Sequence, residues 1–479
     1  MNIKNIDCFA GGGGASTGME EAGVRVDIAI NHDPMAILMH RTNHPDTLHL
    51  TEDIFEVDLS KYLKATDKVG VMWASPDCTS HSRAKGGQPR ENGLRILPWS
   101  VYRLCKQIMD ITGELPQFLF MENVEEIQKW CPLTDEGKPV AKMEGECYKC
   151  FISSMTTGDR KVFCDKNYTC SSCENKNNCI YEYCIDCNYR YANVAHLRFN
   201  FGCTELCAAD YGAPTTRKRW YAVFRSDGKE VKFPKPTHSK DGSNGLKKWI
   251  PVSTVIDWTD LGKSIFARKK PLAEATQRRI ANGIRKFIIN AEDPFIVPEK
   301  EATAFLIQYH GETVKGDARG QTINEPLQTI DTSNRYALVT AFITKFYKTG
   351  VGQGCDEPLH TITTSPGHFG LVSAFLIKYY GGDGVQSVQE PLHTITTKDR
   401  FGLVNIVLDI HGEKYVIKDI FLRMLKPEEL KLAQGFPQNY VINKDYMGKK
   451  YPVKEQVARI GNSVVPVMAK VIIMANLKE

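Results

Sequence analysis

DCFAGGGG, at residues 7–14, is the stretch that decides the fold. It leaves an apolar run over 3–9, which is typical of a buried strand, and enters a helical stretch around 16–22. Glycines at such a turn let the backbone approach a ligand closely beside a helix N-terminus. A tight turn without a ligand would also explain the glycines. The stretch alone therefore predicts the beginning of an α/β fold and makes its first turn a candidate binding loop.

Alternation of strands and helices continues outward from this stretch, over residues 1–130 and again over 196–235. A helix is expected over 97–111, where apolar residues recur at helical spacing. The strands expected after the first lie at 26–31, 48–51, 69–74, 117–121, 197–208 and 219–224. This alternation predicts a largely parallel sheet with helices on both faces.

Composition sets the outer bounds. A chain of 479 residues is too long for one compact core and predicts two or three domains. No apolar run reaches about 18 residues, and the N-terminus lacks an apolar signal core, so a cytoplasmic protein without a membrane span is expected. The net charge of +5 permits a nucleic-acid partner but does not demonstrate one.

Residues 131–195 are polar and rich in cysteine, and they interrupt the sheet pattern as an insertion. Short, regular cysteine spacing in a cytoplasmic chain indicates metal ligands rather than disulfides. Eight thiols are enough for two zinc sites, and an iron–sulfur cluster on the inner four is the alternative. Nesting pairs Cys147, Cys150, Cys184 and Cys187 as one site around Cys164, Cys170, Cys173 and Cys179 as the other.

The chain after the sheet pattern divides into three further segments. Residues 236–300 are expected to form a helical connection, whose basic stretch at 272–287 is interpreted as a solvated helix face rather than a phosphate contact. Residues 301–415 contain a repeat: EPLQTI at 325–330 recurs as EPLHTI at 357–362 and 390–395. The repeat is rich in β-forming residues and favours β-hairpins, either as a duplicated stable unit or as a surface for an extended ligand. Residues 416–479 form a C-terminal segment.

Polar residues follow the carboxyl ends of the expected strands, where open α/β sheets bind ligands. The second strand ends at Asn31 and His32, at the usual place of a ribose contact. Asp53 and Ile54 follow the third, where Asp53 is either an acceptor for an adenine amino group or the cap of the next turn.

Cys78 lies in SPDC, residues 75–78, at the end of the fourth strand. An isolated cysteine is usually a small apolar core residue, but polar and turn-forming neighbours at a carboxyl strand end favour a nucleophile. Glu122 follows the apolar fifth strand and is a candidate acid with a raised pKa, or alternatively a helix cap.

Six segments, taken in order, resemble the motifs of the cytosine-5 DNA methyltransferase family, particularly its phage-like and mobile-element members. They are FAGGGG at 9–14, the loop of Cys78, ENV at 122–124, RKR at 217–219, RML at 423–425 with QGFP at 434–437, and GNSVVP at 461–466. The resemblance implies a Rossmann-like S-adenosylmethionine-dependent methyltransferase sheet and a smaller β-rich target-recognition domain, whereas the predicted cysteine-rich zinc insertion is unusual for the family. It also implies a monomer that acts on double-stranded DNA, without an obligatory protein partner, within restriction-modification.

The resemblance assigns a role to each matched residue. A cytosine flipped out of the duplex would bond to Cys78 through ring carbon 6. Glu122 would hold ring nitrogen 3 and the exocyclic amine, and Arg219 would reach the carbonyl oxygen; Arg217, in the same element, is counted with them as catalytic. Asn123 would brace the Cys78 loop. S-adenosylmethionine would contact Phe9, Ala10, Gly11, Gly12, Gly14, Asn31, His32, Asp53, Ile54, Asn462 and Val464.

Departures from the family pattern keep other functions open. Asp77 replaces the proline that normally precedes the nucleophile, and its carboxylate would disfavour the thiolate. The alternatives are a tRNA cytosine methyltransferase of the same fold and a catalytically silent DNA-binding protein. Target reading in the family uses a Thr-Leu-like dipeptide, for which 329–330, 361–362 and 394–395 all qualify. Arg335 and Arg400 are guanine-contact candidates, with surface salt bridges as the alternative.

Overall fold

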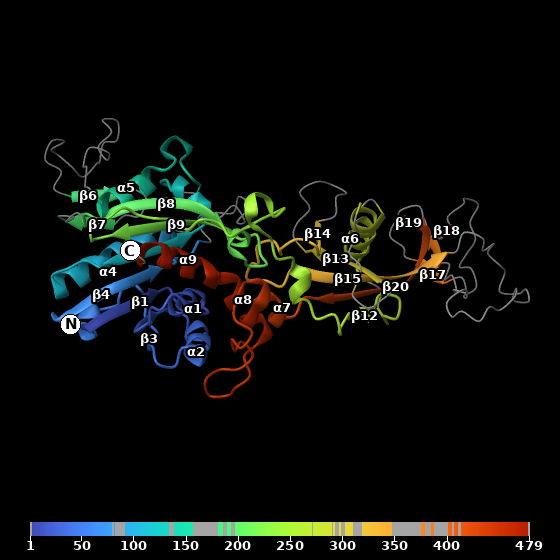
Figure 1. Cartoon of the computed structure of the whole chain (residues 1–479), viewed down its shortest axis with the longest axis horizontal. Coiled ribbons are helices and arrows are strands. Elements are labelled where there is room, and N and C mark those ends of the chain that lie inside the picture. Colours follow the sequence, from blue (N-terminus) through green and yellow to red (C-terminus); the bar gives the residue numbers. More distant parts are fainter. Residues whose placement is uncertain are drawn as a thin grey trace, which may run out of the picture. The chain divides into compact units, whose positions relative to one another are not determined.

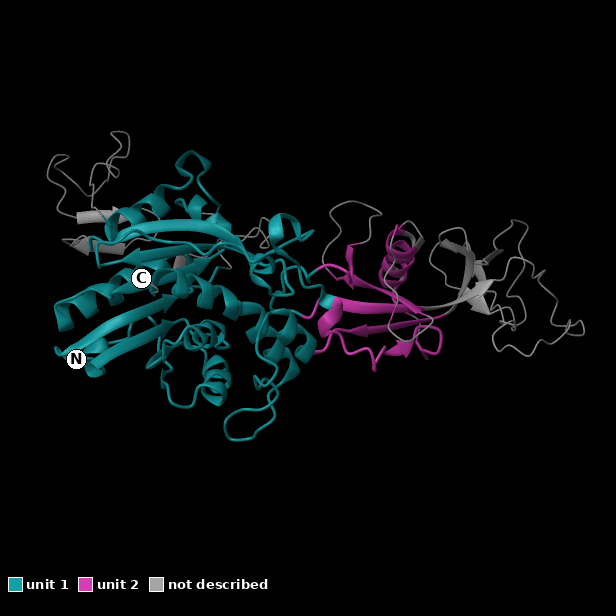
Figure 2. Cartoon of the chain, in the orientation of Figure 1, with its two compact units in different colours: residues 1–252, 326–333, 427–479 teal, residues 253–325, 334–426 magenta. Residues whose placement is uncertain are grey.

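The computed structural model describes 2–78, 81, 92–133, 138–156, 197–270, 272–289, 291–292, 297, 302–309, 319–346 and 413–477, with short strands within 181–192 and 375–410. The chain forms two compact units (Figure 2). Unit 1 comprises Met1–Val252, Pro326–Ser333 and Pro427–Glu479, and unit 2 comprises Ser253–Glu325 and Asn334–Lys426. The repeat copies at 357–362 and 390–395, and the side chains of six of the eight predicted zinc ligands, lie outside the described residues.

Unit 1 is built on a seven-stranded sheet with the order β3-β2-β1-β4-β5-β9-β8. Its strands are β1 (Asn2–Cys8), β2 (Ile28–Ile30), β3 (Leu48–Leu50), β4 (Asp67–Ala74), β5 (Phe118–Asn123), β8 (Asn200–Cys207) and β9 (Lys218–Arg225). The first five are parallel, whereas β9 runs antiparallel to both β5 and β8. The predicted, largely parallel α/β sheet is confirmed.

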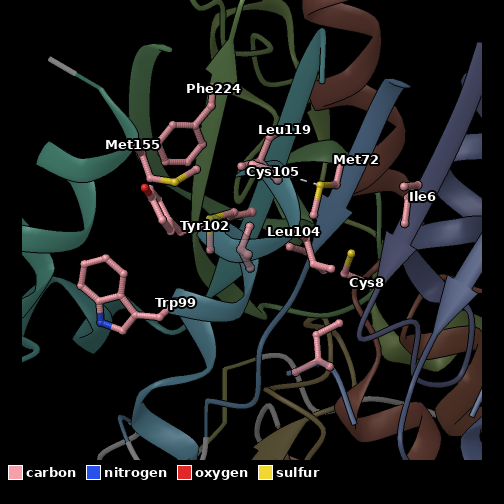
Figure 3. Close-up of a cluster of buried hydrophobic side chains, with 14 of the residues drawn as sticks. Ile6, Cys8, Met72, Trp99, Tyr102, Leu104, Cys105, Leu119, Met155 and Phe224 are labelled. Atoms are coloured by element: carbon pink, nitrogen blue, oxygen red, sulfur yellow. Dashed lines mark hydrogen bonds between the residues drawn. The ribbon is translucent and has the colours of Figure 1, made fainter. Parts of the chain in front are cut away.

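Helices cover both faces of this sheet (Figure 1), because successive side chains on a strand point to opposite sides. On one face Met72 of β4 packs with Cys105 of α4 (Leu97–Thr112), as Figure 3 shows, and α5 (Glu146–Met155) extends the same cluster. On the other face Trp73 packs with residues of α1 (Gly14–Glu21) and α9 (Pro466–Leu477). Each large apolar side chain buried in this way contributes roughly 1.5–3 kcal/mol.

The strand order reverses between β1 and β4. The chain proceeds from β1 to β2 and β3 on one side, and from β4 to β5 on the other. The carboxyl ends of β1 and β4 therefore lie at the switch point of the sheet, which is where open α/β sheets hold their ligands. Residues 9–14 leave β1 at this point, and residues 75–78 leave β4.

The remaining helices of unit 1 are α2 (Pro34–Asn43), α3 (Asn92–Arg95), α7 (Pro427–Ala433) and α8 (Val453–Asn462), and a hairpin of β6 (Tyr181–Cys184) and β7 (Tyr189–Ala192) lies in the predicted insertion. Val453–Leu477 is long and apolar enough to cross a membrane by length and composition, but its most apolar window is 61% buried. Met468 and Ile472 within it are fully buried against the sheet, so the segment is a core element here.

Unit 2 is an antiparallel sheet of the order β12-β20-β15-β13-β14, with β19 also paired to β20. One helix, α6 (Glu274–Ile284), packs Ile280 and Ile284 against Phe305 of β13. The strands are β12 (Lys263–Ser264), β13 (Ala302–Gln308), β14 (Gly320–Thr322), β15 (Tyr336–Phe346), β19 (Val407–Ile410) and β20 (Glu413–Met424), and β16 (Phe375–Lys378), β17 (Val385–Ser387) and β18 (Phe401–Val404) form a separate three-stranded sheet.

The compact units differ from the predicted segments in three places. Residues 416–424 belong to unit 2 rather than to a returning C-terminal segment, because β20 pairs along β15. The predicted connection 236–300 is divided at residue 253, since β12 pairs with β20. Pro326–Ser333, within the predicted repeat domain, belongs to unit 1, where Leu327 N donates to Pro214 O at 2.9 Å and Thr216 N to Leu327 O at 2.8 Å.

Candidate active site

The loop of Cys78 leaves β4 at the switch point of the sheet, and hydrogen bonds to neighbouring residues hold it. Ser75 N donates to the carbonyl of Cys8 at 3.4 Å, and Asn123 Nδ2 donates to the carbonyl of Pro76 at 3.1 Å. Asn123 is 1% exposed, so its amide is buried and held against the backbone of the loop. The side chain therefore makes the bracing contact expected of it, and Cys78 is left half-buried.

Glu122, Arg217 and Arg219 converge beside this loop. Glu122 lies opposite Tyr221 in the antiparallel pairing of β5 with β9, which places Arg219, two residues away, on the same face. Arg219 Nε lies 3.3 Å from Glu122 Oε1, and Arg217 Nη2 lies 3.9 Å from the same oxygen.

Three buried polar atoms of this group lack a hydrogen-bond partner among the described residues: Glu122 Oε1, Arg217 Nε and Arg219 Nε. Buried polar atoms are nearly always hydrogen-bonded in folded proteins, so an unsatisfied carboxylate–guanidinium pair is a place where a ligand with its own donors and acceptors fits. A pyrimidine ring carries both on one edge.

The groups around Cys78 shift the pKa of its thiol in opposite directions. Burial raises the pKa of the thiol above its ordinary value, and Arg219 lowers it again. Glu122 raises this pKa, Arg217 lowers it, and Asp77 raises it with the smallest of these influences. Burial and the neighbouring Arg219 lower the pKa of Arg217 to about 10, so the Arg217 guanidinium stays charged at neutral pH and favours the thiolate of Cys78.

Arg217 differs from Arg219 in what it touches. It is 4% exposed, and its Nη1 donates to Gly461 O at 2.8 Å and to Ile330 O at 3.3 Å. Arg217 thus ties the C-terminal segment and the first Thr-Ile copy to the start of β9. Sequence reasoning grouped the two arginines as catalytic, but these contacts assign Arg217 an anchoring role in addition to its charge.

The glycine loop at 9–14 has the backbone geometry of a ligand-binding turn. Gly11 and Gly13 have φ of +50° and +87°, and Phe9 also lies in the left-handed region at +63°. A bulky residue in that region costs of order 1 kcal/mol and persists only where surrounding structure holds it. Here Ala10 N donates to Ile30 O at 3.0 Å and Thr17 Oγ1 donates to Gly13 O at 2.8 Å.

The C-terminal segment folds back onto this loop, as the predicted roles of Asn462 and Val464 require. A Cβ on Gly14 would lie 2.0 Å from the carbonyl oxygen of Val464, and one on Gly12 would lie 2.8 Å from Ser463 Oγ. Tyr440 OH donates to Gly12 O at 2.6 Å. Val464 is 4% exposed and Asn462 is exposed, so only Asn462 retains a solvent-facing side chain.

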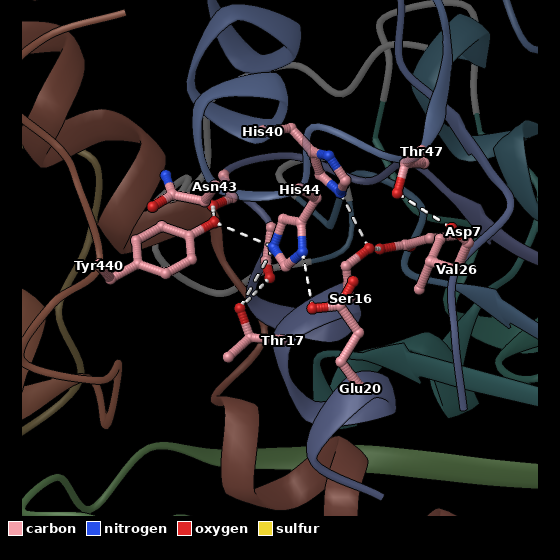
Figure 4. A network of polar contacts seen from close by, with 12 residues as sticks. Asp7, Ser16, Thr17, Glu20, Val26, His40, Asn43, His44, Thr47 and Tyr440 are labelled. Atoms are coloured by element: carbon pink, nitrogen blue, oxygen red, sulfur yellow. Dashed lines mark hydrogen bonds and ion pairs between the residues drawn. The ribbon is translucent and has the colours of Figure 1, made fainter. Parts of the chain in front are cut away.

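A network of buried polar side chains packs against the glycine loop at 9–14 (Figure 4). Ser16 Oγ donates to Asp7 Oδ2 at 2.7 Å and lies 2.9 Å from His40 Nε2, while His44 Nε2 lies 3.4 Å from Tyr440 OH. Burial raises the pKa of Asp7 to about 7 and lowers that of His40 well below its ordinary range. Sequence reasoning missed this network, because its histidines follow no motif or period.

The expected ribose and adenine positions lie at the ends of β2 and β3, beside the glycine loop. Asn31 Oδ1 accepts from Asp33 N at 2.8 Å, so the amide N–H groups are the part of this side chain that could donate to a ligand. Asp53 is exposed, and its Oδ1 accepts from Phe55 N at 2.9 Å, so the turn-capping alternative holds for one of its two oxygens. His32 is exposed, whereas Ile54 is 6% exposed and packs in the core.

These residues fit S-adenosylmethionine in their chemistry. The second carboxylate oxygen of Asp53 can accept from an adenine amino group, and the amide of Asn31 can donate to a ribose hydroxyl. Gly11 meets no atom nearer than 3.6 Å at its Cβ position, so its backbone is open to a ligand.

Cys147 and Cys150 are the two predicted metal ligands whose side chains are described. They lie one turn apart on α5, 4% and 7% exposed, within the hydrophobic cluster beside α4. Among the described residues, no three histidine, cysteine or acidic side chains gather as a metal site.

Comparison with known proteins gives consistent matches. A model of the C-5 cytosine-specific DNA methylase family matches residues 3–151 and 191–478, leaving out most of the predicted insertion. Type II methyltransferase M.AquIA of Picosynechococcus is 25% identical over 245 residues, which cover 50% of this chain and 78% of that protein. M.AgeI of Thalassovita gelatinovora is 33% identical over 248 residues, covering 51% of this chain and 44% of that protein.

Two solved structures align along the whole chain. The Dnmt2 methyltransferase of S. pombe has 14% identity and a TM-score of 0.42, over 100% of this chain and 98% of that one. The methyltransferase EhMeth of Entamoeba histolytica has 13% identity and a TM-score of 0.43, over the full length of both chains.

Proposed function

The chain belongs to the C-5 cytosine-specific DNA methylase family, and from this premise we propose that it methylates a flipped-out cytosine of double-stranded DNA through a covalent bond to Cys78. One observation carries the proposal: an unsatisfied Glu122–Arg219 pair lies at the strand ends beside Cys78. A carboxyl and a guanidinium at this spacing match the edge of cytosine that carries ring nitrogen 3, the amine and the carbonyl oxygen.

Bond formation begins at the thiolate. Because a base inside the duplex is out of reach, the cytosine must first leave the stack. Cys78 Sγ then bonds to ring carbon 6, and the electron pair of the 5,6 double bond moves to carbon 5. Glu122, holding a proton toward ring nitrogen 3, and Arg219, at the carbonyl oxygen, stabilise the charge that develops in the ring.

S-adenosylmethionine, when bound, supplies an electrophilic methyl group to carbon 5. The loop at 9–14, Asn31 and Asp53 would hold it at the switch point of the sheet. Loss of the carbon-5 proton to solvent then restores the double bond and expels the Cys78 thiolate, so the protein ends unchanged. Within this sequence Arg217 stabilises the thiolate as a leaving group and keeps β9 in place.

The substrate is tested with radiolabelled S-adenosylmethionine and either duplex DNA or tRNA. Label in DNA as 5-methylcytosine supports the proposal. Transfer to tRNA alone would replace it by a tRNA methyltransferase, and no transfer to either would favour a silent DNA-binding protein. Sequencing of the methylated DNA then gives the recognised sequence.

We further propose that unit 2 reads the target and that the functional Thr-Ile dipeptide is the copy at 329–330, which belongs to unit 1. The bond from Arg217 to Ile330 O supports this choice, since it links the dipeptide to the catalytic group. Arg335 Nη1 donates to Tyr309 O at 3.4 Å, a contact with its own unit that uses part of its donor capacity.

For the insertion we propose two structural zinc ions, on the partition given by the nested cysteines. The spacing of Cys147 and Cys150 on α5 supports it, because residues three apart on a helix share a face. Elemental analysis of the purified chain should give about two zinc ions per chain. Iron with visible absorbance would favour a cluster instead, and neither metal would refute both assignments.

Asp77 should matter little for the reactivity of Cys78. Its effect on the thiol pKa is the smallest of those around it, so Asp77→Asn should change the alkylation rate of Cys78 by iodoacetamide at pH 7 by less than about threefold, upward. Peptide mass analysis isolates the Cys78 signal. A gain of tenfold or more would mean that the carboxylate lies against the thiol.

Arg219 should set the pH dependence of the reaction. It lowers the pKa of Cys78, so Arg219→Gln raises that pKa, depletes the thiolate at neutral pH and moves the pH–rate profile to higher pH. At pH 7 the rate should fall on the order of 100-fold. Arg219→Lys keeps the charge and is the matched control, which should retain the profile position with a lower maximum. A pH–rate profile of Arg219→Gln that matches wild type would contradict the role of Arg219 in lowering the pKa of Cys78.

A further inference from the structure

The loop between α7 and α8 forms a hairpin, residues 443–451, which the proposed reaction does not use (Figure 1). Its arms are joined by an antiparallel bridge between Lys444 and Lys450 and by Tyr451 N donating to Asn443 O at 2.8 Å. These bonds give the hairpin a defined shape without a partner.

The tip of the hairpin is organised around one buried carboxylate. Asp445, 5% exposed, accepts through Oδ1 from Met447 N and from Lys449 N, both at 2.9 Å. Gly448, with φ of +81°, closes the turn by donating to Asp445 O at 2.9 Å. The negative charge of Asp445 is therefore occupied with the turn itself.

Positive charge accumulates on the outside. Lys444, Lys449 and Lys450, with Lys454 in the first turn of α8, are exposed, and no ion pair joins them to the described residues. Lys444 lies directly opposite Lys450, and like charges at opposed strand positions are destabilising. The two lysines therefore repel each other, and an anion bound between or along the arms would remove this repulsion.

Two large side chains are exposed at the tip of the same hairpin. Tyr446 and Met447 are 45% and 67% exposed at the tip, and the Arg41 guanidinium lies 4.5 Å above the Tyr446 ring. Arg41 belongs to α2, so it adds a fifth cation from a separate element. Cations interleaved with an exposed aromatic ring are typical of nucleic-acid surfaces.

We propose that this lysine hairpin, residues 443–451 with Lys454 and Arg41, is an accessory contact for the sugar–phosphate backbone of DNA. The inference rests on the proposed function, which supplies a polyanion that the enzyme must bind. Charge complementarity favours phosphates over a protein partner, because within the described part of the chain no carboxylate forms an ion pair with these lysines. Such contacts add affinity without reading sequence.

The test measures duplex binding by the full chain over a series of salt concentrations. The hairpin variant carries Lys444→Gln, Lys449→Gln, Lys450→Gln and Lys454→Gln. Its control carries Lys61→Gln, Lys64→Gln, Lys142→Gln and Lys235→Gln, four exposed lysines elsewhere in unit 1. The hairpin variant should bind at least fivefold more weakly at low salt, and the slope of log affinity against log salt should shrink by about 0.9 per lost phosphate contact.

Binding of S-adenosylmethionine should stay equal in wild type and both variants, which verifies that each is folded. Equal DNA affinity and salt slope in the hairpin and control variants would overturn the inference while leaving the proposed function intact. If wild type itself bound and methylated tRNA but not duplex DNA, the proposed function would fail, and the DNA contact with it.

Discussion

Replacing Cys78 by alanine is expected to abolish methyl transfer, with a rate loss of 10⁴-fold or more by the order of magnitude seen when a covalent nucleophile is removed. The thiolate is what turns carbon 5 into a nucleophile, and no other described group beside Glu122 and Arg219 can take its place. Initial rates with radiolabelled S-adenosylmethionine and duplex DNA measure the effect, and DNA affinity should persist.

Cys203→Ala is the matched control for this loss. Cys203 is half-buried like Cys78, but it lies on β8 opposite Ala222, with Tyr148 OH 3.6 Å from its sulfur. Its replacement should leave the methylation rate within about twofold of wild type, since substitutions of partly exposed residues outside a functional site usually have small effects. Residual transfer by Cys78→Ala above one-hundredth of the wild-type rate would contradict a covalent mechanism.

Gly14→Ala is expected to have the second largest effect. Its Cβ would lie 2.0 Å from the carbonyl oxygen of Val464, and backbone on both sides cannot give way without moving the C-terminal segment off the loop. Overpacking of this kind costs about 3 kcal/mol of unfolding free energy. Affinity for S-adenosylmethionine, measured by calorimetry, should fall at least 100-fold because the loop at 9–14 and Val464 shift together.

Gly23→Ala separates this collision from the general cost of filling a glycine. Gly23 ends the same helix with φ of +84° and has nothing within 4 Å of its Cβ position. The control should lose only about 1 kcal/mol, from left-handed strain, and keep its affinity for S-adenosylmethionine. Equal affinities in the two variants would mean that the C-terminal segment does not close the cofactor loop.

The sheet was predictable because parallel strands buried on both faces read as continuous apolar runs. The predicted strands at 3–9, 69–74 and 117–121 end within two residues of β1, β4 and β5. Their carboxyl ends then placed Cys78 and Glu122 at one edge, since parallel strands align their ends. Local periodicity was sufficient for this part of the fold and of the site.

Contacts between distant segments could not be predicted in the same way. Arg217 reaches the carbonyl of Gly461, 244 residues away, through a backbone atom that any residue would offer. Asp7, Ser16 and His40 form a network whose members have no fixed spacing. The boundary at residue 427 depends on β20 continuing along β15, which strand propensity alone does not fix.

The most direct test of the central claim is to trap the covalent bond. Fluorine at carbon 5 of cytosine blocks loss of the carbon-5 proton, so the enzyme should remain attached to duplex DNA that contains 5-fluorocytosine and is supplied with S-adenosylmethionine. Digestion and mass analysis should locate the attachment on the peptide that contains Cys78, in wild type and Cys203→Ala but not in Cys78→Ala. Attachment at another residue, or methylation of ordinary DNA with no trapped species, would contradict the mechanism.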